Sequence, residues 1–174
     1  MNWYKIAKKS YSWMCVEIHK KIANEIQKWG KDNIPDDDLY RPKEFGRELE
    51  THITVKYGLT VDNHEMIKGL FKDEKPIKAK LGKIGFFKNS DDFDVVIIKI
   101  DSKDLHRINE NINNNLNDED KFNDYRPHCT IAYVKKGKAA KHAGDDIFNG
   151  KEIIFNKLIF EDYNDHKTEI KLSN

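Results

Sequence analysis

A His-x-Thr-apolar unit occurs twice in this chain and constrains its fold more than any other feature. The two units are His52-Ile53-Thr54-Val55 and, 76 positions later, His128-Cys129-Thr130-Ile131. Alternate side chains of a β-strand share one face, so each unit would present an imidazole beside a hydroxyl while the middle residue points away. The apolar flanks therefore predict two half-buried strands that each carry a histidine and a threonine on the same side.

Two such pairs, if they meet in one cleft, supply the groups that phosphoryl chemistry needs. Histidine has an ordinary pKa near 6.5, so one ring can accept a proton while the other donates one. An in-line displacement at phosphorus requires both transfers. Two threonine hydroxyls can hydrogen-bond the non-bridging oxygens, and no metal or cofactor is required. The candidate catalytic residues are His52, Thr54, His128 and Thr130, with the order of acid and base left open.

Hydrophobic periodicity predicts a chain in which strands and helices alternate. Gly30 is interpreted as the stop of the first helix, and Ser102 as the cap of the last. Met1 to Ser10 is expected to be a loosely docked helical extension. The predicted strands are Ser12 to Ile18, Glu50 to Tyr57, Ile77 to Phe87, Val95 to Ile100, His128 to Val134, Glu152 to Phe155, Lys157 to Glu161 and Thr168 to Leu172, and the helices are Lys20 to Trp29, Asn63 to Phe71 and Ser102 to Leu116.

Charge and length limit the classes of function. The 31 basic residues against 30 acidic ones argue against binding long duplex nucleic acid, whereas small anionic ligands remain possible. No apolar run suits a membrane span, and the N-terminus lacks a signal-peptide pattern. We expect a cytoplasmic monomer whose 174 residues form a single two-lobed domain. Cys15 and Cys129 are expected to be buried, reduced thiols.

Five further residues are candidates for substrate binding, each with a plainer alternative. Lys56 lies four positions after His52, on the cleft face if the strand stays regular, and could hold phosphate; a solvated lysine is the alternative. Tyr125 could stack on a base and Arg126 could pair with phosphate, although turn packing would also explain them. Lys135 and Lys136 begin a basic loop that could attract an anion or simply be solvated.

The two motifs resemble the signatures of the two-histidine (2H) phosphoesterase superfamily, which includes enzymes named 2'-5' RNA ligases. The stretch Leu81 to Phe87 before a buried strand, the helix with Leu105, and Pro127 before the second histidine are similar to that family's layout. The similarity covers nearly the whole chain apart from Met1 to Ser10. The basic loop after Val134 resembles small phage and prophage members, which would place the protein in a host cytoplasm.

This resemblance implies a bilobal α+β fold with pseudo-two-fold symmetry, in which two antiparallel sheets surround a central groove and helices lie outside. It also implies metal-independent cleavage of a cyclic or 2'-5' phosphodiester in a small nucleotide or short oligonucleotide. Family members act on RNA 2',3'-cyclic phosphates, 2'-5' oligoadenylates or cyclic nucleotide signals of antiphage defence. A rival hypothesis is a non-catalytic protein that binds nucleotides or RNA ends in the same groove.

Overall fold

Eight strands and three α-helices make up the described part of the chain. The computed structural model describes residues 11–88, 91–119 and 124–173, so the predicted helical extension at Met1 to Ser10 lies outside the described residues. The elements are β1 (Ser12–Glu17), α2 (Lys20–Asn33), the 3-10 turn η1 (Asp36–Asp38), β2 (His52–Leu59), α3 (His64–Leu70), β3 (Ile77–Lys88), β4 (Phe93–Asp101), α4 (Lys103–Asn115), β5 (His128–Lys135), the 3-10 turn η2 (Ala140–His142), β6 (Glu152–Phe155), β7 (Lys157–Glu161) and β8 (Lys167–Lys171).

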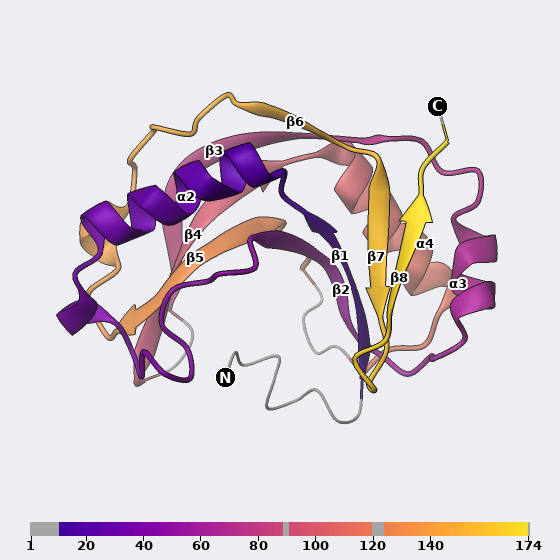
Figure 1. Cartoon of the computed structure of the whole chain (residues 1–174), viewed down its shortest axis with the longest axis horizontal. Helices are drawn as coiled ribbons and strands as arrows, with labels where there is room; N and C mark the ends of the chain where they lie inside the picture. Colours follow the sequence, from indigo (N-terminus) through magenta and orange to yellow (C-terminus); the bar gives the residue numbers. More distant parts are fainter. Residues whose placement is uncertain (1–10, 89–90, 120–123, 174) are drawn as a thin grey trace.

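The strands form one curled antiparallel sheet in the order β6-β3-β4-β5-β2-β1-β7-β8 (Figure 1). This confirms the predicted antiparallel α+β class. The two expected sheets are joined, however, because β2 pairs with β5 through Ile53 and Cys129. On either side of that pair the chain repeats a strand, a helix and a motif strand, as β1-α2-β2 and as β4-α4-β5. The repeat relates the two halves by a pseudo-two-fold axis between the motif strands.

The helices cover one face of the sheet and leave the other to the motif histidines. Ile53 and Cys129 are fully buried in the main hydrophobic core together with apolar residues of all three helices. Figure 1 shows α2 along one half of the arch and α4 with α3 along the other. A second, smaller cluster lies apart from that core and consists of Phe93, Val95, Ile97 and Tyr133, with Tyr40, Phe45 and Phe87 packed against them.

Gly30 does not end the first helix, contrary to the sequence-based expectation. Helix α2 runs on to Asn33, and the N–H of Ile34 closes its last turn on the Gly30 carbonyl. The glycine is needed for close packing, since a Cβ at this position would lie 2.8 Å from Cγ2 of Ile131. The absent side chain lets α2 approach β5 directly behind the second motif.

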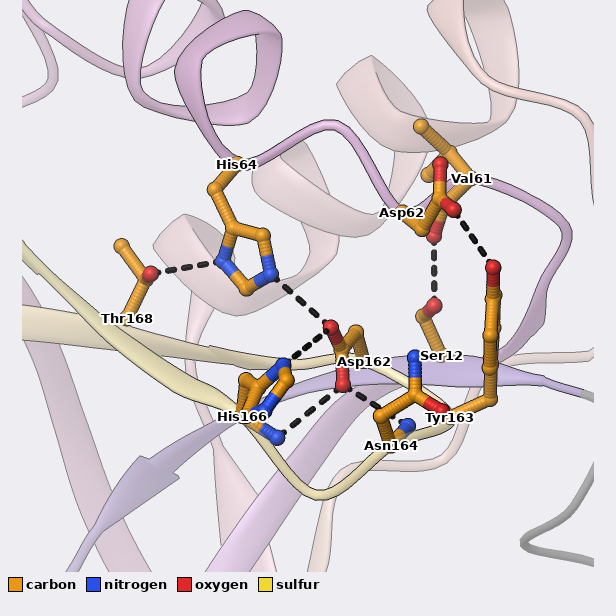
Figure 2. A network of polar contacts seen from close by, with 9 residues as sticks. All are labelled: Ser12, Val61, Asp62, His64, Asp162, Tyr163, Asn164, His166 and Thr168. Atoms are coloured by element: carbon orange, nitrogen blue, oxygen red, sulfur yellow. Dashed lines mark hydrogen bonds and ion pairs between the residues drawn. The ribbon is translucent and has the colours of Figure 1, made fainter.

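A buried carboxylate fastens the β7–β8 hairpin to α3 (Figure 2). The side chain of Asp162 is 5% exposed, and its Oδ1 accepts hydrogen bonds from the N–H groups of Asn164 and His166. Its Oδ2 contacts Nε2 of His64 at 3.1 Å, and Nδ1 of the same ring contacts the Thr168 hydroxyl at 2.7 Å. Burial alone would raise the pKa of Asp162, but these hydrogen bonds outweigh it and hold the pKa at about 2.

Substituting Asp162→Ala should destabilise the fold by about 1–3 kcal/mol, because the partly buried N–H donors of the hairpin turn would lose their acceptor. Urea denaturation measures this loss. The carboxylate's contribution is complete above its ordinary pKa of 3.8 and should disappear as the pH falls toward 2. As a control, Asp62→Ala removes an exposed acceptor of Tyr163 and should change stability by less than about 0.5 kcal/mol. Equal effects of the two substitutions would contradict this account.

Candidate active site

The four motif side chains form a square on the open face of the sheet. Ile53 lies opposite Cys129 in the antiparallel pairing of β2 with β5. Continuing this register by one residue in each direction places His52 opposite Thr130 and Thr54 opposite His128. The two imidazoles thus occupy one diagonal and the two hydroxyls the other, with diagonal neighbours roughly 7–8 Å apart. All four side chains are partly exposed, whereas the two central residues are fully buried.

Each motif strand bulges immediately after its threonine. In β2, Thr54 pairs with Cys15 but Lys56 pairs with Met14, so Val55 is the extra residue. In β5, Thr130 pairs with Ile97 but Ala132 pairs with Val96, so the extra residue is Ile131. A bulge increases the local twist and changes the direction of neighbouring side chains. The same irregularity in both halves shows that the pseudo-symmetry extends to the backbone of the site.

Both histidines are oriented by a carbonyl two residues earlier in the chain. Nδ1 of His52 lies 2.5 Å from the Glu50 carbonyl oxygen, and Nδ1 of His128 lies 2.7 Å from that of Arg126. A carbonyl only accepts, so each Nδ1 carries the proton and donates it. The Nε2 atom of each ring is left to accept or to donate a proton at the substrate.

Aromatic rings pack edge-on against the two imidazoles. Trp13 lies 5.2 Å from His52, and Phe87 lies 4.8 Å from His128, measured between ring centroids. Burial lowers the pKa of His128; the hydrogen bond to Arg126 opposes this shift, while the nearby His52 adds to it. A lowered pKa keeps His128 neutral at neutral pH, which is the form that accepts a proton.

The expectation that Lys56 lies on the cleft face is wrong. It assumed a regular strand, and the bulge at Val55 instead sets Lys56 beside Met14, which is fully buried in the core. Its side chain is 6% exposed, and its ammonium pairs with Asp118 at 3.2 Å. Lys56 therefore stabilises the contact between β2 and the segment after α4.

Tyr125 and Arg126 make hydrogen bonds to residues of the two motifs. The Tyr125 hydroxyl donates to the Thr54 carbonyl oxygen at 3.0 Å, its ring packs on the main core, and burial raises its pKa. The Arg126 carbonyl oxygen accepts the hydrogen bond from Nδ1–H of His128, while the exposed Arg126 guanidinium pairs with Asp124. These contacts are the packing alternative that the sequence had left open. Their roles in substrate binding stay predictions.

The lysines at the end of β5 both contact other parts of the protein, one through a carbonyl and one through a carboxylate. Lys135 donates to the carbonyl oxygen of Asp37, and Lys136 pairs with Asp94 at 3.3 Å. Lys135 follows His128 by seven positions along the strand, which corresponds to roughly 20 Å. Neither lysine reaches the square, and their predicted attraction for substrate stays a prediction.

Three residues beside the square were missed from the sequence. Trp13 and Phe87 contact the imidazoles, and Lys99 of β4 is the Cα partner of His128. The lysine did leave a signal, because it interrupts the apolar run Val-Val-Ile-Ile-Lys-Ile. By contrast, Cys129 is buried as expected, and burial raises the pKa of its thiol.

Two kinds of feature are absent from the described part of the chain. Across residues 11–88, 91–119 and 124–173 no group of three or more His, Cys, Asp or Glu side chains is arranged to hold a metal ion. Within the same ranges no helix has the length and apolar character to span a membrane.

Sequence comparison places this arrangement among known proteins. The family model of the 2'-5' RNA ligase superfamily matches residues 18–153, which include both motifs. A curated relative, the RNA 2',3'-cyclic phosphodiesterase of Methanocaldococcus jannaschii, is 34% identical over 151 residues, and the match covers 83% of each chain.

Solved structures share the fold at low sequence identity. The protein TT0787 of Thermus thermophilus aligns with a TM-score of 0.62 at 15% identity, covering 94% of this chain and 100% of the other. E. coli LigT in complex with phosphate aligns with a TM-score of 0.57 at 13% identity, covering 94% of this chain and 95% of LigT. At these identities the likeness concerns the fold alone.

Proposed function

This chain belongs to the 2'-5' RNA ligase superfamily of two-histidine phosphoesterases, and we propose that it is a metal-independent phosphodiesterase that opens 2',3'-cyclic phosphates on short RNA or nucleotides. The family relationship makes it a hydrolase. The observation that carries the proposed chemistry is the square of two imidazoles on one diagonal and two hydroxyls on the other, centred on the Ile53–Cys129 pair. The named activity of the relative from M. jannaschii supports the choice of a cyclic phosphate.

In this proposal the phosphorus atom lies at the centre of the square. Neutral His128 takes a proton from water through Nε2 as the water oxygen bonds to phosphorus. His52, on the opposite corner, donates a proton to the 2' or 3' oxygen that leaves, so the ring opens to a phosphomonoester. The hydroxyls of Thr54 and Thr130 donate to the non-bridging oxygens, where negative charge increases in the transition state. Neither hydroxyl bonds to another described residue, which leaves both available.

The pH dependence of hydrolysis tests this assignment. We expect kcat/KM for adenosine 2',3'-cyclic phosphate to follow a bell-shaped profile. Its acidic limb should lie below 6.5, because burial lowers the pKa of His128 and the base is lost only when that ring becomes protonated. Activity should survive EDTA. Loss of activity with the chelator, or a rate independent of pH on the acidic side, would contradict the mechanism.

The substrate is tested by a panel that keeps the chemistry constant. Adenosine 2',3'-cyclic phosphate, 2'-5' oligoadenylate and cyclic oligonucleotides of the kind used as antiphage signals each present a phosphodiester of a different geometry. We expect the 2',3'-cyclic phosphate to have the highest kcat/KM. A preference for a 2'-5' linkage or a cyclic oligonucleotide would retain the two-histidine chemistry and overturn the proposed substrate.

A further inference from the structure

Lys99 is an exposed cation on the same side of the sheet as the catalytic square. Cα partners in neighbouring strands point their side chains to one face, and Lys99 is the partner of His128. Its neighbours Ile98 and Ile100 are buried on the opposite face, within the main core. A lysine here puts a charge one strand away from the base proposed above.

The backbone of β3 provides a path for the Lys99 side chain. Two residues of β3, Gly82 and Lys83, face the single residue Lys99 in a bulge. A Cβ on Gly85 would lie 2.9 Å from Cε of Lys99, so the lysine stem runs across β3 over that glycine. Phe87, two residues further along the same strand, contacts the His128 ring. The bulge and the glycines thus leave room for the lysine stem on the face that carries the site.

The charge of Lys99 has no counterion among residues 11–88, 91–119 and 124–173, where the structure describes side chains. Two of the three lysines considered above contrast with it, because Lys56 pairs with Asp118 and Lys136 with Asp94. Lys80, which lies earlier in β3, also has a counterion, Glu152, at 3.7 Å. An anion supplied by the substrate would meet Lys99 without displacing an ion pair.

We propose that Lys99 binds the phosphate on the 5' side of the nucleotide whose 2',3'-cyclic phosphate is opened. Its stem leaves β4 on the side away from β5 and crosses β3 at Gly85, whereas the phosphoryl group of the proposal lies between β5 and β2, at the centre of the square. That position suits the neighbouring phosphate of an RNA substrate. The inference rests on the proposed function and makes the substrate an oligonucleotide or a 5'-phosphorylated nucleotide.

Three substrates distinguish the contribution of the 5' phosphate from that of the rest of the nucleotide. Adenosine 2',3'-cyclic phosphate has no 5' phosphate, its 5'-phosphorylated form has one, and the dinucleotide ApA 2',3'-cyclic phosphate has one plus a second nucleoside. Lys99→Met should raise KM about tenfold for the last two substrates, the effect of losing a charge-assisted contact, and leave kcat unchanged. KM for the first substrate should not change. Lys99→Arg should restore most of the loss, and Lys80→Met, which removes the same charge nearby, should have no effect.

Each other outcome overturns the inference. An equal rise in KM for all three substrates would mean that Lys99 contacts the scissile phosphate, and no rise would mean that it contacts none. A rise for the dinucleotide alone would assign Lys99 to the second nucleoside. A binding measurement separates this inference from the catalytic proposal. If the protein turns over no substrate, Lys99→Met should still weaken the binding of adenosine 3',5'-bisphosphate and leave the binding of adenosine 3'-monophosphate unchanged. If the variant bound the bisphosphate as tightly as the parent protein does, the inference would be rejected.

Discussion

Replacing either His52 or His128 with alanine is expected to lower kcat on a 2',3'-cyclic phosphate by about 10²- to 10⁴-fold, the usual contribution of a positioned acid or base. Each ring is held by one carbonyl through Nδ1, which leaves Nε2 as the atom that would react in the proposed mechanism. In the proposed mechanism the two rings act on one displacement, so the double variant should be scarcely slower than either single variant. Single-turnover rates with adenosine 2',3'-cyclic phosphate measure this effect without a contribution from product release.

A third histidine provides the matched control. Nε2 of exposed His19 also contacts a backbone carbonyl, that of Ile154, at 2.8 Å. His19→Ala therefore removes a ring with the same kind of contact from outside the square and should leave kcat unchanged. Both active-site variants should bind adenosine 3'-monophosphate nearly as well as the parent protein. If the His52 and His128 variants keep full rates, the chemistry lies elsewhere in the molecule.

Local sequence was enough to predict most of the fold. The cap at Ser102 was recognised correctly, since its hydroxyl accepts the N–H of Leu105. The strands also followed from periodicity, and alternation within each motif showed that its histidine and threonine share one face. These features depend on a few neighbouring residues. Gly30 shows the limit, because its role depends on Ile131, a residue of a strand about a hundred positions away.

The bulges explain why the surroundings of the site were harder to predict. Alternation along a strand holds only while the pairing is regular, and Val55 interrupts it one residue before Lys56. A bulge arises from pairing with a neighbouring strand, so a single strand's sequence does not reveal it. Lys99 was missed for a related reason. Its position beside His128 is a property of the β4–β5 register and is not visible in the run Val95 to Ile100 alone.

The bulges also matter for the second prediction, the loss of kcat expected when a motif threonine loses its hydroxyl. Val55 and Ile131 are the extra residues directly after Thr54 and Thr130, so the position of each hydroxyl is fixed by an irregularity that anchors the next side chain in the core. Thr54→Val or Thr130→Val keeps the branched shape and removes only the hydroxyl. Each should lower kcat by about 10²- to 10³-fold, the loss found when one donor to developing charge is removed.

Serine substitution distinguishes the hydroxyl from the methyl group at these positions. Thr54→Ser and Thr130→Ser keep the donor and should retain most of the rate, whereas a purely structural threonine would tolerate valine better than serine in a strand. The loss should appear mainly in kcat, because the non-bridging oxygens, which already share one negative charge in the substrate, carry more in the transition state. A valine variant with full kcat, or a serine variant as slow as valine, would remove that threonine from the oxyanion contacts and leave the histidine pair as the whole of the catalytic machinery.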